Sequence, residues 1–248
     1  MNRNPREVLI FALDVGEGIK EAISWVERLK DTVEIFKVGK ESFTRYGPRI
    51  IDSIREKGKK VFLDLKFHDI PHTVAGAVVG AVELGVYMFN VHALGGRKMM
   101  EETVTAAYSA VKLGRQKPII LAVTVLTSLN DNDLMQLGFG CRADELAVRL
   151  AKIAQESGIS GVVSSVHDID NIRSACGQDF IIVSPGIRES DVADDDQKRT
   201  STVRNAIMRG ADYIVVGRPI SKAKDPVCKA EEIVCEITQV LAMREKVV

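Results

Sequence analysis

Eight short runs of aliphatic and β-branched residues recur along the chain, and they constrain its fold more than any other feature of the sequence. The runs are nearly continuous in apolar residues, which is typical of strands buried on both faces of a parallel sheet. They cover residues 8–14, 33–39, 60–66, 87–93, 118–126, 161–165, 180–184 and 213–217. We therefore predict eight strands of this buried kind.

Helical patterns fill the gaps between these runs. Residues 17–30, for example, place apolar side chains at helical spacing. Similar patterns cover residues 73–84, 98–113, 143–156, 200–209 and 227–243. Asp225 followed by Pro226 provides an N-cap and a proline at the first helical position, which predicts the start of the last helix.

Eight strand–helix units in a chain of 248 residues are typical of a (β/α)₈ barrel. A doubly wound open sheet is the alternative α/β architecture. The strand count and the positions of the polar residues favour the barrel. Because no linker or low-complexity segment divides the sequence, we predict a single barrel domain over residues 1–248.

The composition excludes several classes of function. The 34 basic and 34 acidic residues cancel, which argues against a nucleic-acid-binding face or a charged patch for a membrane surface. No segment approaches the roughly 20 apolar residues that span a bilayer, and the N-terminus lacks the apolar core of a signal peptide. The four cysteines have no common zinc-binding spacing. We expect a cytoplasmic protein with buried, reduced thiols.

The third strand ends in an unusual cluster of charges. Asp64, Lys66 and Asp69 lie within six residues directly after an apolar run, and three such charges are costly to bury without a function. Period-two alternation directs Asp64 and Lys66 to the same face of a strand, whereas Asp69 falls in the following loop. A carboxylate–ammonium–carboxylate row of this kind indicates a site that handles protons.

Other polar residues end or follow separate strands. In a (β/α)₈ barrel, the C-terminal ends of the strands form the active-site mouth, so these side chains should converge there. They are Asp14, Lys37, Asn90, His92, Thr127, Ser128, the segment Ser184-Pro185-Gly186-Ile187-Arg188, and the pair Gly217-Arg218.

The loops after strands 7 and 8 favour a phosphate site, as they often do in barrels. Gly186 and Gly217 allow backbone N–H groups to approach an anion, and Arg188 and Arg218 can add charge-assisted hydrogen bonds. The first of these loops is long and contains Gln197, which is typical of a loop that covers a ligand.

Structural explanations stay open for several of these residues. The charges at the end of strand 3 are compatible with a structural ion network, and His92 with a packed residue near the site. No glycine-rich dinucleotide loop or Walker motif occurs, which argues against a dinucleotide or ATP enzyme. The other structural alternatives are a helix cap for Asp14, a salt bridge for Lys37, a surface position for Arg188, and turn hydroxyls for Thr127 and Ser128.

The segment from Asp64 to Thr73 resembles the Asp-x-Lys-x-x-Asp-Ile-Pro-x-Thr signature of the orotidine 5′-phosphate decarboxylase family. Five further segments carry the resemblance over nearly the whole chain: LDVG, FKVG, VTVLTS, SPGIR and VVGRPI. The chain is similar to the shorter, bacterial form. It departs from that form at His72, where bacterial members usually carry Asn.

The resemblance implies that orotidine 5′-monophosphate is converted to uridine 5′-monophosphate and CO₂, the last step of UMP biosynthesis, without metal or organic cofactor. It implies that Lys66 protonates C6 of the pyrimidine as CO₂ leaves. Asp64 would lie beside the leaving carboxylate, and Lys37 would complete the charged row. Asp69 and Thr73 would reach the neighbouring subunit's site in a homodimer with shared active sites.

The remaining residues would bind the substrate, again by resemblance. Their implied contacts are the ribose hydroxyls for Asp14 and Lys37, the pyrimidine edge for Thr127 and Ser128, and the phosphate for Gln197, Gly217 and Arg218, with Pro185 and Arg188 in the adjoining loop. Two rivals stay open. One is a Mg²⁺-dependent sugar-phosphate decarboxylase or aldolase of the same barrel superfamily, and the other is a non-catalytic barrel that binds nucleotide phosphates.

Overall fold

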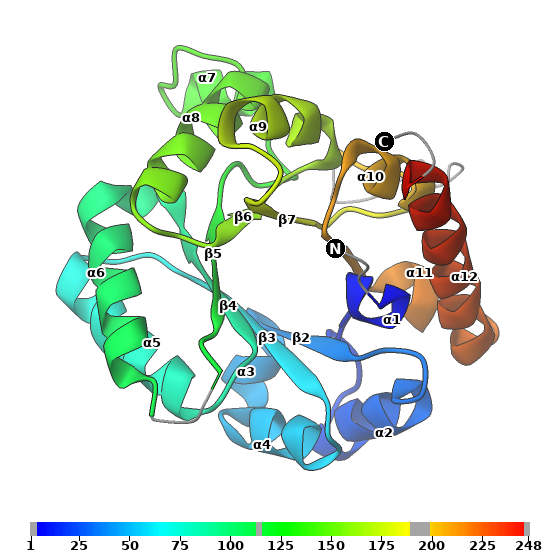
Figure 1. The fold of residues 1–248 in the computed structure, drawn as a ribbon. Helices are drawn as coiled ribbons and strands as arrows, with labels where there is room; N and C mark the ends of the chain where they lie inside the picture. Colours follow the sequence, from blue (N-terminus) through cyan, green and yellow to red (C-terminus); the bar gives the residue numbers. More distant parts are fainter. Residues whose placement is uncertain (1–3, 113–115, 189–198, 246–248) are drawn as a thin grey trace.

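In the computed structural model, eight parallel strands form a closed barrel in the order of the sequence, which confirms the predicted (β/α)₈ fold. The structure describes residues 4–112, 116–188 and 199–245. Figure 1 shows the strands as a central ring with the helices around it. The strands are β1 Leu9–Ala12, β2 Ile35–Gly39, β3 Lys60–Phe67, β4 Met88–His92, β5 Ile119–Val123, β6 Gly161–Val163, β7 Ile181–Ser184 and β8 Tyr213–Val216.

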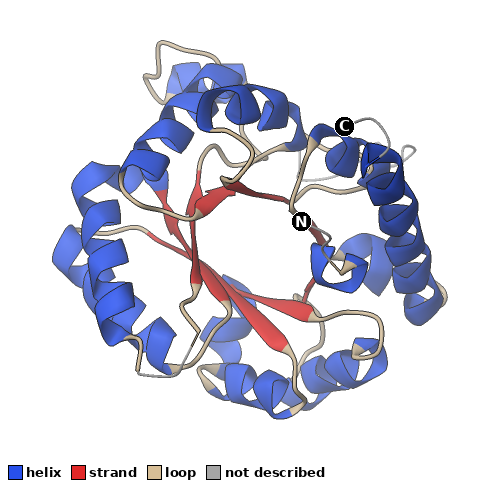
Figure 2. Ribbon diagram, viewed as in Figure 1, coloured by secondary structure: helices blue, strands red, loops and turns tan. Residues whose placement is uncertain are grey.

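Helices cover the outside of the barrel, as the colouring by secondary structure shows (Figure 2). The α-helices are α1 Pro5–Val8, α2 Ile19–Leu29, α3 Lys40–Tyr46, α4 Arg49–Glu56, α5 Pro71–Glu83, α6 Gly96–Ala110, α7 Asp131–Gln136, α8 Ala143–Glu156, α9 Ile169–Cys176, α10 Val203–Arg209, α11 Arg218–Ser221 and α12 Pro226–Glu245. Two short 3₁₀ turns, η1 Ala93–Gly95 and η2 Val166–Asp168, follow β4 and β6.

Each of the six predicted helices is present; α8 has the predicted bounds, and the other five have shifted ends. The Asp225 carboxylate accepts hydrogen bonds from the N–H groups of Val227 and Cys228, which confirms the N-cap of α12. The sequence pattern missed α1, α3, α4, α7, α9 and α11, because each has only four to eight residues and shows too few turns for a clear period.

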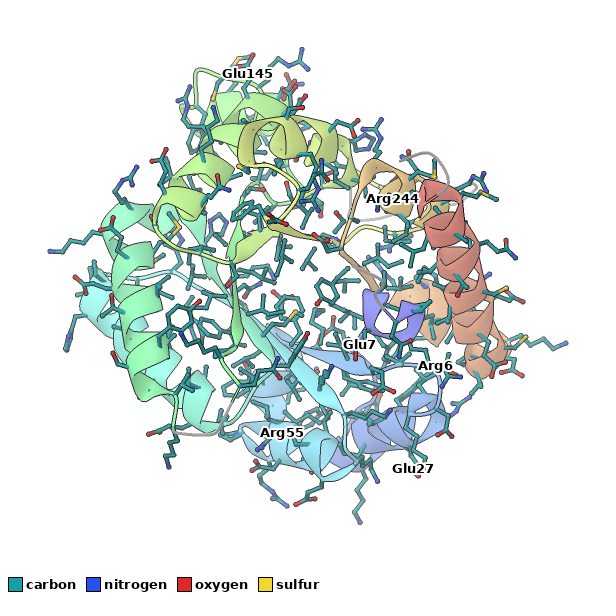
Figure 3. The ribbon with its side chains drawn as sticks, in the orientation of Figure 1. Arg6, Glu7, Glu27, Arg55, Glu145 and Arg244 are labelled. Atoms are coloured by element: carbon teal, nitrogen blue, oxygen red, sulfur yellow. The ribbon has the colours of Figure 1, made fainter. Side chains whose placement is uncertain are left out.

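Two layers of apolar side chains form the core. The outer layer lies between strands and helices and contains large buried residues such as Phe11, Phe36 and Phe89. The inner layer fills the barrel itself and contains Ile10 and Tyr213, among others. Figure 3 shows side chains occupying the interior of the ring, whereas the labelled carboxylates Glu27 and Glu145 lie at the periphery.

The period of two along the strands places the site. Ile35, Phe62 and Met88 belong to the inner layer of β2, β3 and β4. Because side chains alternate, the residues two positions further along each strand face the same interior, one level nearer the C-terminal mouth. Those residues are Lys37, Asp64 and Asn90, so three polar groups lie directly above the apolar barrel core.

The prediction of buried thiols is wrong for Cys228 and Cys235, and Cys141 is only half-buried. Cys228 and Cys235 are exposed on α12, because this helix turns its other face, with Ala230 and Ile237, toward the barrel. Cys176 is buried. Within the ranges that the structure describes, no helix is long and apolar enough to cross a membrane.

Candidate active site

A cavity of about 640 Å³ opens at the C-terminal ends of the strands. It is bounded by residues from several strands and their loops, as expected for the mouth of a (β/α)₈ barrel. Ten of the predicted site residues line it: Asp14, Lys37, Asp64, Lys66, Thr127, Ser128, Pro185, Arg188, Gly217 and Arg218.

Four of these side chains form a continuous row of alternating charge. The Lys37 ammonium lies 2.9 Å from Asp14 Oδ2 and 3.4 Å from Asp64 Oδ2. On the other side of Asp64, Oδ1 lies 2.6 Å from Lys66 Nζ. The order Asp14–Lys37–Asp64–Lys66 therefore gives each inner member a neighbour of opposite charge on both sides.

Lys37 lies in the middle of β2 rather than at its end, where the sequence pattern had placed it. This position buries the Lys37 side chain almost completely, and Asp64 is nearly as buried. Lys66 and Asp14, at the two ends of the row, are more exposed. The row therefore has a buried centre and two ends that a ligand in the cavity can reach.

Electrostatics keep the centre of the row ionised. Burial alone would lower the pKa of Lys37, but the carboxylates of Asp64 and Asp14 outweigh it and raise that pKa above its usual value. Burial likewise favours protonated Asp64, yet the ammonium groups of Lys37 and Lys66 and two hydrogen bonds hold the pKa of Asp64 below its usual value.

Asn90 is the residue of this site to which the sequence assigned no role. Its Nδ2 donates to Asp64 Oδ1 at 2.7 Å, and its Oδ1 accepts from the backbone N–H of Lys66 at 2.8 Å. It is fully buried on β4. The side-chain amide of Asn90 therefore orients both the Asp64 carboxylate and the backbone of Lys66. Its register two residues after Met88 is the signal that would have identified it.

The backbone at Lys66 corrects the prediction of a regular strand. Lys66 has φ +51°, the only non-glycine residue with positive φ among those described. Between Leu63 and Phe67, β3 advances four residues while β4 advances two, so the strand bulges here. Bulges re-aim side chains and are frequent beside active sites. Lys66 therefore reaches Asp64 through an irregular turn of the chain, stabilised by Asn90.

Gly39 makes room for the Asp14–Lys37 pair. A Cβ atom at Gly39 would lie 2.9 Å from both Asp14 Oδ1 and Lys37 Nζ, closer than a carbon normally approaches. Gly39 has an ordinary extended backbone, so space rather than conformation requires glycine here. The sequence alone could not reveal this contact, because it joins β2 to the residues that follow β1.

Asp69 and Thr73 do not reach the cavity of their own chain. Both residues are exposed, and neither lines the cavity. The Asp69 carboxylate accepts a hydrogen bond from the N–H of Ile70 at 2.6 Å, just before α5 begins. Gln197, the other predicted site residue, lies outside the described residues.

The loop after β7 has a firmly held base. Arg188 donates its backbone N–H to Ser201 O at 2.9 Å, and Ser201 donates to Gly186 O at 3.1 Å. Gly186 has φ +78°, a conformation that favours glycine. After the adjacent strand β8, Gly217 lies so close to Ala12 that an added Cβ would approach within 3.2 Å. Both glycines allow tight backbone approaches at the predicted phosphate end.

His92 is a packed residue beside the charged row. It lies at the end of β4, stacks on His68 with ring centroids 5.2 Å apart, and accepts the N–H of Leu94 at Nδ1. Burial, followed by the charges of His68, Lys66 and Lys40, lowers the pKa of His92 to about 4. Among the described residues, no group of three His, Cys, Asp or Glu side chains is arranged to hold a metal ion.

The depressed pKa of His92 predicts a pH dependence of stability. Between the ordinary value of 6.5 and about 4, the unfolded chain binds the proton more readily than the folded chain, so the free energy of unfolding should fall as the pH falls. Replacing His92 by Gln should reduce this loss of unfolding free energy by about 1–3 kcal/mol over the interval, which flattens the pH dependence. Denaturant unfolding at pH 7, 5.5 and 4.5 measures it, with the exposed His72→Gln as control. An unchanged slope in His92→Gln would contradict the prediction.

Comparisons with known proteins identify the family of this chain. A family model described as "Orotidine 5'-phosphate decarboxylase / HUMPS family" matches residues 7–233. The orotidine 5′-phosphate decarboxylase of Syntrophus aciditrophicus is 57% identical over 247 residues, which cover 98% of each chain. That of Geobacter sulfurreducens is 50% identical and covers 89% of this chain and 92% of its own length.

Solved structures give the same result. The crystal structure of orotidine 5′-phosphate decarboxylase from Lactobacillus acidophilus matches with a TM-score of 0.82 at 35% identity, over 93% of this chain and 99% of its own. The enzyme from Pyrococcus horikoshii matches with a TM-score of 0.72 at 26% identity. Since the sequence relatives and the family model extend over most of the chain, the protein belongs to the orotidine 5′-phosphate decarboxylase / HUMPS family.

Proposed function

We propose that this chain decarboxylates orotidine 5′-monophosphate to uridine 5′-monophosphate and CO₂. The observation that carries the proposal is the row Asp14–Lys37–Asp64–Lys66, with its buried centre and its accessible Lys66. The names of relatives at 49–57% identity, all orotidine 5′-phosphate decarboxylases, support it.

The row suits the chemistry of this reaction. Loss of CO₂ leaves negative charge on C6 of the pyrimidine, a carbon with no ordinary electron sink. A fixed ammonium beside that carbon stabilises the developing carbanion and then delivers a proton to it. We assign this role to Lys66. Asp64 holds the Lys66 ammonium in place and lies beside the departing carboxylate, and Lys37 balances the charge of Asp64.

The other lining residues bind the substrate in this proposal. Asp14 and Lys37 hold the ribose hydroxyls, and Thr127 and Ser128 meet the pyrimidine edge. Arg188, Gly217 and Arg218 bind the phosphate, together with Gln197. The phosphate is remote from the bond that breaks, so its binding energy can organise the site without changing the chemistry at C6.

We further propose a homodimer in which Asp69 and Thr73 complete the partner's site. Both are exposed, and neither lines the cavity of its own chain. The neighbouring Ile70 is 66% exposed and Leu94 is 44% exposed, and a stacked His68–His92 pair links their loops. Exposed apolar side chains beside polar ones are typical of a protein interface.

Turnover of orotidine 5′-monophosphate tests the activity directly. In the presence of a chelator, the purified chain should remove the orotate absorbance, and Lys66→Ala should lower kcat by about a thousandfold or more. Binding of uridine 5′-monophosphate to Lys66→Ala should persist. Lys20→Ala, an exposed lysine on α2, is the control.

Each rival has its own outcome in that experiment. Turnover that depends on Mg²⁺, with no conversion in chelator, would favour the sugar-phosphate decarboxylase or aldolase. Nucleotide binding without any conversion would favour the non-catalytic barrel. Full turnover by Lys66→Ala would remove Lys66 from its assigned role.

Replacement of Gly39 tests the spacing of the charged row. The added methyl of Gly39→Ala would collide with both Asp14 and Lys37, so we expect kcat/KM to fall about ten- to a hundredfold. Steady-state kinetics and thermal unfolding measure the effect. Gly18→Ala, whose Cβ would meet no atom within 4 Å, is the matched control. Wild-type kinetics in Gly39→Ala would show that the row tolerates displacement.

Mixing two inactive variants tests the shared site. An Asp69→Ala chain and a Lys66→Ala chain should regain one intact site per mixed dimer, so equal amounts should recover up to about a quarter of the wild-type activity. Asp64→Ala mixed with Lys66→Ala is the control, because both residues belong to one chain's cavity and no mixed site is intact. Absence of recovery after demonstrated subunit exchange would place Asp69 outside the partner's site.

A further inference from the structure

A buried ion pair connects the segment before α10 to the turn after β6. The Arg199 guanidinium contacts the Asp168 carboxylate. The Asp168 side chain is inaccessible to solvent, and that of Arg199 is 12% exposed. Next to this pair, His167 Nε2 lies 3.2 Å from the carbonyl oxygen of Thr200. The two segments are therefore joined at two consecutive positions.

Hydrogen bonds also connect Asp168 to the wall of the cavity. Ser164 Oγ donates to Asp168 Oδ2 at 3.2 Å, and the hydroxyls of Ser164 and Thr124 lie 2.9 Å apart. All three side chains are buried, and Ser164 lines the cavity. A polar chain thus extends from Arg199 to the cavity wall formed by β5 and β6.

The backbone after Arg199 forms a second connection, to the proposed phosphate end of the cavity. Two residues further along, Ser201 forms backbone hydrogen bonds with Arg188 and Gly186, and both of those residues line the cavity. Displacing Arg199 would therefore displace Ser201, and with it the backbone that presents Arg188. The same ion pair is connected to the cavity on two sides.

Stability alone is a poor explanation for this pair. Burying two charges costs about as much as their attraction returns, so buried ion pairs are weak stabilisers. Arg199 Nη1 is also buried without an acceptor among the described residues, which adds a further cost. By contrast, Arg209 and Asp170 join α10 to α9 through an ion pair that is largely exposed and has no link to the cavity.

We propose that Arg199 and Asp168 are positioning residues that hold the phosphate-binding side of the cavity in place. The proposal rests on the proposed function, because it assigns the substrate's phosphate to the end of the cavity with Arg188. Neither residue touches the substrate. Loss of the pair should therefore weaken the binding of the substrate's phosphate. It should leave the chemistry at the pyrimidine, where Lys66 acts, unaffected.

Two substrates separate these effects. Orotidine 5′-monophosphate carries the phosphate, and orotidine is the same nucleoside without it. In Arg199→Gln and in Asp168→Asn, kcat/KM for orotidine 5′-monophosphate should fall about ten- to a hundredfold, mainly through KM. The slow conversion of orotidine, followed at high enzyme concentration, should stay within about twofold of wild type. Arg199→Lys, which keeps the charge, should recover part of the loss.

Asp170→Asn is the matched control, since it removes the more exposed ion pair between the neighbouring helices α9 and α10 and should leave both substrates unaffected. Equal losses on both substrates, or no loss on either, would overturn the proposal. Failure of both Arg199→Gln and Asp168→Asn to fold would assign the pair to stability and overturn it as well. Failure of the wild-type chain to convert orotidine 5′-monophosphate would instead refute the proposed function.

Discussion

The ionised carboxylate of Asp64, buried above the apolar core of the barrel, is the constraint on which the site depends. A charge in that position is costly unless its oxygens are satisfied. Lys37 contacts one oxygen, and Lys66 and Asn90 contact the other. The buried charge of Asp64 therefore accounts for the placement of three neighbouring side chains. The same attractions fix the Lys66 ammonium before any substrate arrives, and such preorganisation is a major source of electrostatic catalysis.

The barrel supplies these positions through its register. Lys37, Asp64 and Asn90 come from three adjacent strands, and each follows an inward-facing residue of the core by two positions. A strand held on both sides by hydrogen bonds places a side chain more accurately than a loop does. Lys66 is the exception, because the bulge in β3 and its positive φ direct it by a local irregularity. Such irregularities persist at functional sites when the surroundings hold them, and here Asn90 does so.

The sequence was sufficient for the strands and for the mouth because both follow from local patterns. Eight apolar runs became eight strands, and ten of the predicted site residues met in one cavity. What the sequence could not provide depends on contacts between distant segments. The demand for glycine at position 39 arises from Asp14, the role of Asn90 depends on the register of β4 against the bulge, and the Asp168–Arg199 pair joins residues 31 positions apart. The helices of four to eight residues escaped detection because one or two turns show no clear period.

The two ends of the cavity are therefore held in place by different kinds of interaction. Lys37, Asp64 and Lys66 of the charged row belong to hydrogen-bonded strands. The opposite charges of neighbouring members neutralise one another. The proposed phosphate end consists of loop backbone that is held by hydrogen bonds at Ser201, two residues after the ion pair of Arg199 with Asp168. In the proposed reaction, chemistry at C6 requires fixed charge, whereas the remote phosphate must be able to enter and leave, which loops permit more readily than strands do. In the proposed function, a rigid reacting end and a loop-built binding end thus share one cavity, and the hydroxyl of Ser164 connects the wall of that cavity to Asp168.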